Sequence, residues 1–245
     1  MIDLHSHILP GMDDGAETME DGIEMARMAA DTGTKVILAS SHGDFSRISP
    51  EDWMKKYNSR LRHFRQEVKR NNIGIQVASG AELLVNDALI RCAGKHHLPS
   101  LNHGSYILAE FEFDISADLM QKYINTLTDL GWRIVLAHPE RYDCVKRDVR
   151  ILFPMYEKGI LLQVNKGSLS GMFGRGANRI ADIMLGEGIA GIVASDAHDP
   201  LIRTPELDET ADNLDLYYGN NASEILLRRN PCSVLTSRPY EEIRN

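Results

Sequence analysis

Met1-Ile2-Asp3-Leu4-His5-Ser6-His7 opens the 245-residue chain with a short apolar run that ends at two histidines. Six further short runs, rich in Val, Ile and Leu and without strict alternation, follow along the sequence. Such runs are typical of strands in a parallel sheet that is buried on both faces. The seven predicted strands cover residues 1–4, 35–40, 75–78, 106–109, 133–137, 159–164 and 190–194.

Stretches with helix start and stop signals separate the predicted strands. Thr18 and Asp21 form a capping box for a helix that should end at Gly33. Ser49 followed by Pro50 starts a second helix, which we expect to end at residues 71–72. This alternation predicts either a βα-barrel or an open doubly wound sheet. Further helices are expected over residues 116–131, 145–159, 178–188 and 222–229, the last stopped by Pro231.

Residue types that bind metals follow six of the seven predicted strands. In a barrel, the carboxyl ends of all strands meet at one face, which would bring these side chains together. An open sheet would spread them along an edge. We therefore predict a single α/β domain over residues 1–245, folded as a TIM-like barrel. The side chains concerned are His5, His7, His42, Glu82, Glu110, His138, Asp196 and His198.

Two of these strand ends repeat the same spacing. His5 and His7 stand at i and i+2 and would point to one face of a strand, where two imidazoles can hold one cation. Alone, such a pair more often consists of ordinary surface or core histidines. Asp196 and His198 repeat the spacing, and the alternative there is a helix N-cap with a chance histidine.

The remaining candidates favour a metal site with more than one ion. Glu82 and Glu110 end apolar runs, where a buried carboxylate needs a metal or an arginine partner. Coincidence at six strand ends is hard to sustain, so we predict metal binding. Imidazoles and carboxylates without thiolates suit Mn²⁺, Fe²⁺ or Zn²⁺ and argue against a structural zinc site. The candidates are too many for one ion, which indicates two or three ions that share carboxylates.

Composition restricts the partners and the compartment. The formal net charge of -8 argues against nucleic acid or an anionic membrane as the main partner. Cys92, Cys144 and Cys232 lack zinc-finger spacing, which favours a reducing compartment. The sequence shows neither a secretory signal nor an apolar run that could span a bilayer, so we expect a cytoplasmic protein without membrane insertion.

Five motifs occur in order along essentially the whole chain. They are Asp3-x-His5-x-His7-Ile8-Leu9-Pro10-x-x-Asp13-Asp14-Gly15, Ala39-Ser40-Ser41-His42, Gly80-x-Glu82, His138-Pro139-Glu140-Arg141 and Ser195-Asp196-Ala197-His198. Together they resemble the polymerase and histidinol phosphatase (PHP) superfamily. Within the superfamily, the Leu-Pro-x-x-Asp-Asp-Gly segment resembles the corresponding segment of one branch, the bacterial tyrosine-protein phosphatases from capsule and exopolysaccharide operons.

This resemblance implies a distorted (β/α)7 barrel with three divalent metal ions, most often manganese, with iron or zinc as alternatives. The first ion would be held by His5, His7, Glu82 and Asp196. Glu82 would bridge to a second ion, which is also held by Glu110 and His138. The third ion would be held by Asp14, His42 and His198. Arg141 and Arg203 match positions that contact phosphate in the family.

The activity that the resemblance implies is hydrolysis of protein phosphotyrosine by a metal-bound hydroxide. The substrate would be a bacterial tyrosine autokinase of polysaccharide synthesis. The planar guanidinium groups of Arg141 and Arg203 suit the phosphoryl oxygens. One position departs from the family, because Gly43 stands where a second histidine is usual. The alternatives are a small-molecule phosphoesterase, such as a histidinol-phosphate phosphatase, and a non-catalytic metal-binding module.

Two further segments admit competing interpretations. Cys144 and Arg150 have the C-x5-R spacing of cysteine phosphatases, but the residues between them include no glycine and carry Asp148, so we interpret the match as chance. The glycine-rich segment 167–176 is either a flexible connection or part of the entrance for a peptide.

Overall fold

The computed structural model describes residues 1–94 and 98–238 and shows an α/β fold with parallel sheets. Every strand pairing is parallel. One sheet has the order β1 (Ile2–Ser6), β2 (Val36–Ala39) and β4 (Gln76–Ser79). The other has the order β3 (His42–Gly43), β5 (Glu82–Leu84), β6 (Tyr106–Glu110), β7 (Arg133–Ala137), β8 (Leu161–Asn165) and β9 (Ala190–Ala194).

Two predicted strands continue beyond a short interruption. The chain of β2 passes through Ser40 into β3, and the chain of β4 passes through Gly80 into β5. The amide of Ser40 donates to the carbonyl of Ser6 at 2.9 Å, and the amide of Glu82 donates to the carbonyl of Ser40 at 3.0 Å. These bonds keep the strand ends together across the interruption, which the sequence pattern did not predict.

A second junction lies between β1 and the segment after β9. Ser6 and Ala197 form an isolated parallel bridge, and the amide of His7 donates to the carbonyl of Ala197 at 2.8 Å. Hydrogen bonds therefore connect the two sheets at two places, from Glu82 of β5 to Ser40 after β2 and from His7 after β1 to Ala197 after β9. The ends of the first and last strands of the sequence meet here.

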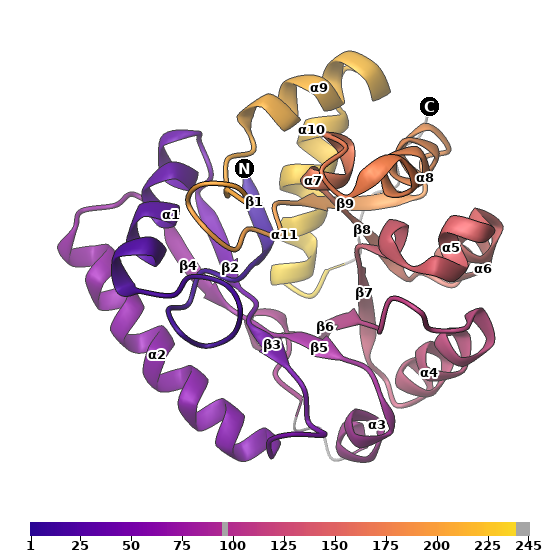
Figure 1. Cartoon of the computed structure of the whole chain (residues 1–245), viewed down its shortest axis with the longest axis horizontal. Helices are drawn as coiled ribbons and strands as arrows, with labels where there is room; N and C mark the ends of the chain where they lie inside the picture. Colours follow the sequence, from indigo (N-terminus) through magenta and orange to yellow (C-terminus); the bar gives the residue numbers. More distant parts are fainter. Residues whose placement is uncertain (95–97, 239–245) are drawn as a thin grey trace.

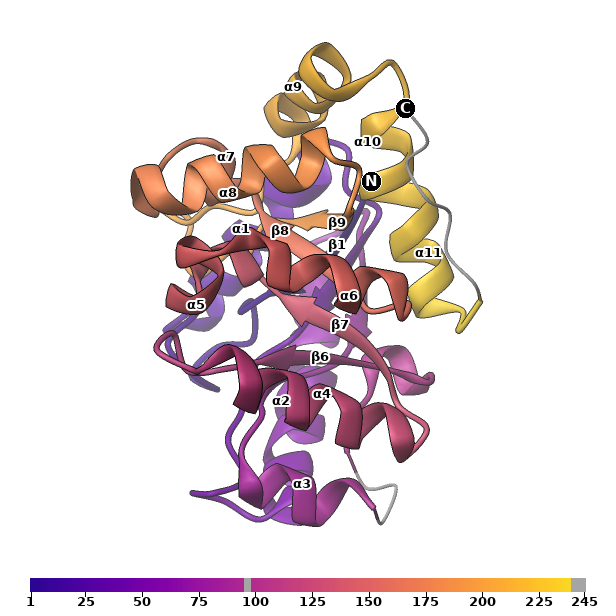
Figure 2. The same ribbon diagram turned by 90° about the vertical axis from the view of Figure 1, so that its right-hand side faces the viewer.

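Helices lie around the strands (Figures 1 and 2). The α-helices are α1 (Met19–Asp31), α2 (Pro50–Arg70), α3 (Asp87–Ala93), α4 (Ala117–Asp129), α5 (Asp143–Arg147), α6 (Phe153–Glu157), α7 (Lys166–Leu169), α8 (Gly174–Gly186), α9 (Asp208–Tyr218), α10 (Ala222–Glu224) and α11 (Asn230–Leu235). Short 3-10 turns cover η1 (Leu101–His103), η2 (Pro139–Arg141) and η3 (Val149–Leu152), and η4 (Ile225–Arg229) is a π-helix. Within the described ranges, no helix is both long and apolar enough to cross a bilayer.

The strands are buried on both faces, as their apolar composition predicts. On β7, Ile134 and Leu136 pack in the large cluster against the helices, while Val135 and Ala137 pack in a smaller cluster between strands. Both sets of side chains are almost completely buried. This two-sided burial explains why the sequence of β7 shows no alternation of apolar and polar residues.

The predicted helix starts are confirmed at α1 and α2. Thr18 accepts from the amide of Asp21, and the Asp21 carboxylate accepts from the amide of Thr18, which completes the capping box. Ser49 caps α2 by accepting from the amide of Asp52, with Pro50 in the first turn. Each cap satisfies amides that have no partner within the helix.

Two helix predictions are wrong in detail. The expected helix 145–159 is broken into α5, η3 and α6, because Asp148 adopts an extended conformation and its side chain accepts from the amide of Arg150. The expected stop at Pro231 does not occur, and the helix continues to Leu235. The π-helix η4 ends two residues before this proline and changes the backbone register, and Pro231 lies in the first turn of α11, where a residue without an N–H is accommodated.

Candidate metal centre

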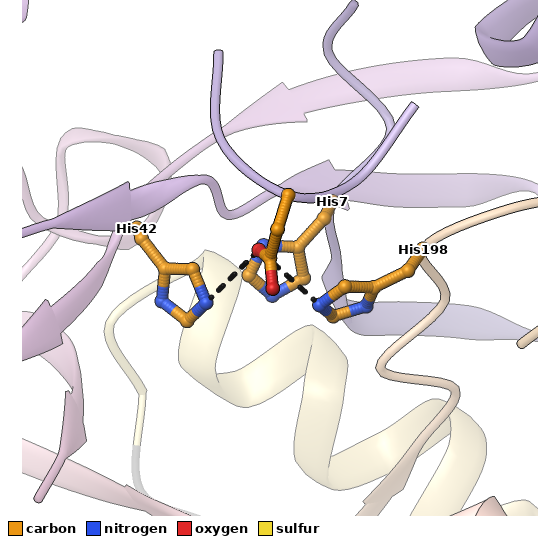
Figure 3. Close-up of side chains that lie close together, drawn as sticks. His7, His42 and His198 are labelled. Atoms are coloured by element: carbon orange, nitrogen blue, oxygen red, sulfur yellow. Dashed lines mark ion pairs between the residues drawn. The ribbon is translucent and has the colours of Figure 1, made fainter. Parts of the chain in front are cut away.

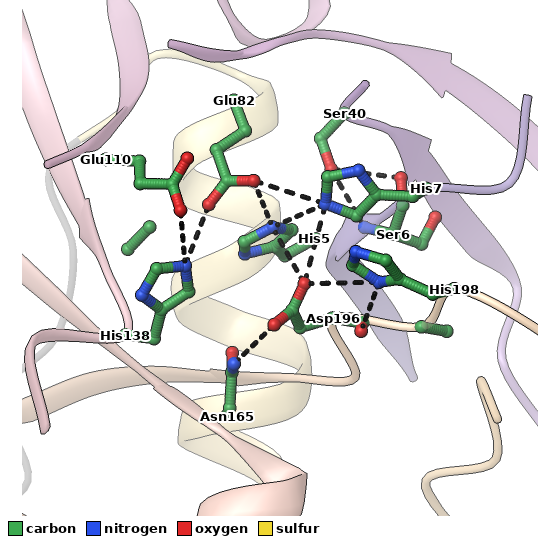
Figure 4. A network of polar contacts seen from close by, with 12 residues as sticks. His5, Ser6, His7, Ser40, Glu82, Glu110, His138, Asn165, Asp196 and His198 are labelled. Carbon is green, nitrogen blue, oxygen red and sulfur yellow. Dashed lines mark hydrogen bonds and ion pairs between the residues drawn. The ribbon is translucent and has the colours of Figure 1, made fainter. Parts of the chain in front are cut away.

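The carboxyl ends of the strands converge on one cluster of imidazoles and carboxylates (Figure 4). Four overlapping groups of their side chains each place one nitrogen or oxygen per residue within 4.8 Å of one another. The nine residues that the sequence singled out as metal ligands all belong to these groups. They are His5, His7, Asp14, His42, Glu82, Glu110, His138, Asp196 and His198.

The centre of the cluster joins the first and last strand ends. The Nε2 atoms of His5 and His7 lie 3.2 Å apart. Glu82 Oε2 lies 3.1 Å and 3.2 Å from these two nitrogens. Asp196 Oδ1 lies 3.3 Å and 3.5 Å from the same pair. These four donors are the ones that the resemblance gave to a first ion.

Glu82 extends the cluster toward a second group of donors. Its Oε1 lies 2.9 Å from His138 Nε2, and Glu110 Oε1 lies 3.6 Å from the same nitrogen. Its Oε2 lies 3.1 Å from His42 Nδ1, which is 3.3 Å from Glu110 Oε2. Because both of its oxygens face donors of different groups, Glu82 has the position of a bridging ligand.

A third group lies on the other side of His7 (Figure 3). Asp14 Oδ1 is 3.4 Å from His42 Nε2 and 3.6 Å from His198 Nε2. The ring of His7 lies 4.5 Å from that of His42 and 4.0 Å from that of His198, measured between centroids. Asp14 is the most exposed donor here, so this side of the cluster faces the solvent.

A chain of hydrogen bonds fixes the tautomer of His5. Asn165 Nδ2 donates to the carboxylate of Asp196, so Asn165 Oδ1 is free to accept from Gln163 Nε2 at 2.7 Å. Gln163 Oε1 then accepts from His5 Nδ1 at 2.9 Å. With its proton on Nδ1, neutral His5 presents the Nε2 lone pair to the cluster.

Two further imidazoles are oriented in the same way. His7 Nδ1 donates to Asp13 Oδ2 at 2.9 Å, and the same carboxylate accepts from the amides of His42 and Gly15. His198 Nδ1 donates to the carbonyl of Asp196 at 3.0 Å. Each bond holds Nε2 toward the centre, which is how outer partners orient histidine ligands.

Asp13, Gln163 and Asn165 were not predicted to serve the site. Asp13 belongs to the first sequence motif, in which the resemblance gives a metal to Asp14 and not to Asp13. Gln163 and Asn165 are fully buried polar residues at i and i+2 of the otherwise apolar strand β8. A buried polar pair with that spacing was the signal that sequence reasoning passed over.

The electrostatics of the carboxylates reflect their histidine neighbours. Burial opposes ionisation of Asp13, but the imidazole of His7 beside it holds the pKa of that carboxyl well below its usual range. Burial also opposes ionisation of Asp196, and the charge of His5 overcomes it, so that its pKa is strongly lowered. Both side chains are therefore anionic at neutral pH.

Protons on histidines balance this negative charge in the metal-free protein. Burial alone would lower the pKa of His42. Hydrogen bonds to the carboxylates of Asp14 and Glu110 outweigh this effect and raise the pKa to about 10. Burial and the neighbouring charge of His7 lower the pKa of His198 to about 3. His42 is thus protonated and His198 is neutral at pH 7.

The donor set fits divalent metal ions. Glu82 Oε2 has no hydrogen-bond partner among the residues that the structure describes, although nitrogens of His5, His7 and His42 lie within 3.2 Å. A buried carboxylate oxygen without a hydrogen-bond partner lowers the stability of the folded protein. Imidazole and carboxylate donors that converge without hydrogen-bond geometry are the ligands that Mn²⁺, Fe²⁺ and Zn²⁺ accept.

The two predicted arginines lie together beside the cluster. Arg141 Nη1 lies 3.2 Å from Asp196 Oδ2, and Arg203 Nη2 donates to the same oxygen. Both guanidinium groups lie over the ring of Phe173, at 4.2 Å and 5.4 Å from its centroid. Two partly exposed guanidinium groups at the edge of the cluster are suited to an anionic substrate.

Gly43, the position that departs from the family, lies on β3 with its neighbour His42 in the cluster. A Cβ atom at Gly43 would lie 2.9 Å from Leu83 Cδ2 and would require that side chain to move. The short strand therefore packs closely against Leu83 on β5.

The C-x5-R match has no phosphate cradle. Arg150 pairs with Asp148 at 2.8 Å on an exposed surface. Cys144 is buried, and burial raises the pKa of its thiol. A protonated buried thiol and a paired arginine do not form the thiolate site of a cysteine phosphatase.

The glycine-rich segment forms α7 and the first turn of α8 rather than an open connection. It lines a hollow of about 670 Å³ together with residues from α9 and from the loop before it. Lys166 crosses this region, donating to Thr204 Oγ1 at 3.1 Å and to the carbonyl of Glu206 at 2.8 Å. The hollow lies next to Arg203, because Thr204, the following residue, belongs to its lining.

A parallel α/β fold with mixed imidazole and carboxylate donors at its strand ends, and with arginines beside them, is typical of metal-dependent hydrolases of anionic substrates. Residues 1–236 match the model of the family described as capsular polysaccharide synthesis, CpsB/CapC. The chain belongs to this family.

Similar proteins carry related descriptions. The tyrosine-protein phosphatase YwqE of Bacillus subtilis is 32% identical over 235 residues, covering 93% of this chain and 92% of that protein. The tyrosine-protein phosphatase CpsB of Streptococcus pneumoniae is 27% identical over 243 residues, covering 96% and 98%. A solved structure from a study of YwqE and CpsB, described as unique metal-dependent tyrosine phosphatases, matches with a TM-score of 0.88, 29% identity and full coverage of both chains.

A more distant likeness concerns the fold alone. The dihydropyrimidinase of Brevibacillus agri superimposes with a TM-score of 0.58 at 11% identity, covering 98% of this chain and 72% of that one.

Proposed function

We propose that this chain is a metal-dependent protein-tyrosine phosphatase, a phosphoric monoester hydrolase. The observation that carries the proposal is the convergence of nine imidazole and carboxylate side chains beside Arg141 and Arg203. The phosphatase descriptions of relatives that align over nearly the whole chain support the choice of substrate class.

The chain's own residues would divide the work as follows. Divalent metal ions supply Lewis acidity, which polarises phosphoryl oxygens and lowers the pKa of water to about 7. Arg141 and Arg203 would hold the phosphoryl oxygens, because planar guanidinium groups match them with paired N–H donors. The phenol of tyrosine leaves with a pKa of about 10, so the demand for a general acid is small.

The metal content is part of the proposal. We infer three divalent ions, with manganese first and iron or zinc as alternatives, since the donors contain no thiolate. The three ligand sets are those that the family resemblance implies, and the position of Glu82 between His138 and the His5–His7 pair supports its bridging role. His7 also faces the third set, within one donor group with Asp14, His42 and His198.

The architecture that we propose is one distorted (β/α)7 barrel in a single domain over residues 1–245. The hydrogen bonds from Glu82 to Ser40 and from His7 to Ala197 support continuity between the two sheets. If β2 and β3 count as one interrupted strand and β4 and β5 as another, the nine strands β1 to β9 of the described residues become the seven strands that a barrel of this type requires.

The proposed partner is the tyrosine-phosphorylated tail of a bacterial tyrosine kinase in polysaccharide synthesis, met in the cytoplasm. The family description supports the process, and the phosphatase names of the relatives support a phosphotyrosine protein. We propose no nucleic-acid partner, because the chain carries a formal net charge of -8.

The test is turnover of a phosphotyrosine peptide, with and without chelator, combined with metal analysis of the same sample. We expect chelation to abolish hydrolysis and added Mn²⁺ to restore it. Full activity in excess EDTA would contradict the proposal. Free histidinol phosphate serves as the comparison substrate, and faster hydrolysis of that compound would favour a small-molecule phosphoesterase instead.

A further inference from the structure

Two phenylalanines flank the guanidinium group of Arg141 and have no role in the metal cluster. Arg141 Cζ lies 4.6 Å from the ring centroid of Phe113 and 4.2 Å from that of Phe173. Phe113 is one of the few large apolar side chains on the surface, with 42% of its area exposed. The ring centroid of Phe113 lies 6.1 Å from that of His138, so Phe113 lies at the edge of the donor cluster.

The placement of Phe173 depends on a glycine. A Cβ atom at Gly167 would lie 2.7 Å from Phe173 Cε2, too close for the ring to stay where it is. The missing side chain at Gly167 therefore lets the ring lie against the start of α7 and beneath both arginines. Phe113 is held from the other side, where its carbonyl accepts from the amide of Asp143 at 2.8 Å.

A hollow of about 210 Å³ opens between these rings. Its lining consists of Phe113, Arg141, Lys146, Phe173 and Ala177. Two aromatic rings and one methyl group supply the apolar part, and the two cations suit the anionic end of a ligand. A phosphate held by Arg141 would have its ester substituent within reach of this hollow.

We propose that Phe113 and Phe173 form the subsite for the aromatic ring of the substrate and thereby select phosphotyrosine over aliphatic phosphoesters. The inference rests on the proposed phosphatase function. Aromatic pairs favour offset or edge-to-face contacts, which a phenol ring gains here and a serine or threonine ester does not. The ligand class is an aryl phosphate, with its phosphoryl oxygens on the arginines and its ring on the phenylalanines.

The test compares two non-hydrolysable ligands that differ only in the ring. Phenylphosphonate and methylphosphonate carry the same anionic group, so the ratio of their Kd values, measured calorimetrically on the metal-loaded protein, reports the ring contact. We expect the wild type to prefer phenylphosphonate. Phe113→Leu and Phe173→Leu should each lower this preference by roughly 2- to 10-fold, the range that an aromatic pair contributes, and should leave methylphosphonate binding nearly unchanged.

Two control variants bracket this result. Phe113→Tyr keeps a ring at the same place and should keep the preference. Tyr217→Leu removes an aromatic side chain that is 72% exposed on α9 and that does not line the hollow, so it should have no effect.

Two outcomes would overturn the proposal. An unchanged ratio in both leucine variants would mean that the rings do not contact the ligand. A parallel weakening of both phosphonates would mean that the rings act only by holding Arg141 in place. A wild type that prefers phenylphosphonate but does not hydrolyse a phosphotyrosine peptide would contradict the proposed function and leave the ring subsite standing.

Discussion

The hydrogen bond between His5 Nδ1 and Gln163 decides which ring nitrogen of His5 faces the cluster. The direction of this bond is set at the far end of the hydrogen-bond chain, because the Asp196 carboxylate can only accept from Asn165. Asn165 must then accept from Gln163, so Gln163 accepts from His5. A metal ligand at the first strand is thus oriented by a carboxylate that lies after the last strand.

Gln163→Leu should weaken metal binding about 10- to 100-fold, the usual effect of removing such an outer partner. Without its acceptor, His5 loses the preference for a proton on Nδ1, and Nε2 is no longer reserved for the ion. Metal titration of the chelator-treated protein measures the loss. Gln121→Leu on α4, where the side chain donates to Asn125, is the matched control and should bind metal as the wild type does. Equal affinities in both variants would contradict the role of Gln163.

Arg141→Lys should lower kcat/KM for a phosphotyrosine peptide about 10-fold, and Arg141→Gln roughly 100-fold, in line with the loss of a charged transition-state donor. Lysine keeps the charge but lacks the planar fork that pairs with two phosphoryl oxygens. The metal content should stay unchanged, because Arg141 contacts Asp196 Oδ2 while Oδ1 faces the histidines. Steady-state kinetics together with metal analysis check the prediction, and a kcat/KM equal to that of the wild type in both variants would refute it.

The residues at strand ends were predictable from the sequence, whereas the contacts of their outer partners were not, although the spacing of Gln163 and Asn165 marks both residues as unusual. His5, Glu82 and His138 each follow or end a buried apolar run, where a charged or polar side chain stands out in the sequence. Gln163 lies inside such a run, and its role depends on β8 facing His5 of β1, which is a property of the tertiary structure. Spacing along one strand carries no information about the neighbour that a side chain meets.

At the scale of elements, α2 holds the two interrupted strands in place. Tyr57 donates its hydroxyl proton to the carbonyl of Ala39 at 2.7 Å and accepts from the amide of Gly80 at 2.9 Å. Trp53 Nε1 donates to the carbonyl of His42 at 2.8 Å. These bonds satisfy backbone groups that the breaks between β2 and β3 and between β4 and β5 leave without ladder partners.

Tyr57→Phe should destabilise the protein by about 1–3 kcal/mol, the cost of leaving buried donors and acceptors without partners. Tyr123→Phe is the matched control, because its hydroxyl donates to Asp87 on an exposed surface and its loss should cost less than about 1 kcal/mol. Denaturant unfolding of the metal-loaded proteins gives both values. Equal stabilities for the two variants would show that the bonds of Tyr57 at the breaks contribute nothing.

Elements were predictable where local signals decide them. The caps at Thr18 and Ser49 are local, and α1 and α2 begin where those residues indicate. The breaks at Ser40 and Gly80 were not predictable, because they depend on hydrogen bonds to β1 and on packing against Leu38. Pro231 misled for a similar reason, since a preceding π-helix lets the helix continue through it.

At the scale of the whole molecule, the donor cluster draws on both ends of the chain. His5 lies on the first strand and His198 follows the last, and the parallel bridge between Ser6 and Ala197 brings these segments together. Parallel strands require that all carboxyl ends lie on one side, and the expectation of a barrel rather than an open sheet then predicted that the motifs meet. Bound metal ions should therefore connect the first strand, the last strand and the strands between them.

The metal-free protein should lose stability as the pH rises above the ordinary histidine pKa of about 6.5. In that form, hydrogen bonds to Asp14 and Glu110 raise the pKa of His42 to about 10, against the effect of burial. A raised pKa in the folded state means stabilisation that is complete below about 6.5 and is lost as the pH approaches about 10. Metal ions replace these protons, so the loaded protein should not show the decline. Urea midpoints of both forms across this window test the prediction, with His63→Gln as the control on the exposed face of α2. A metal-free protein whose midpoint stays constant or rises would disprove it.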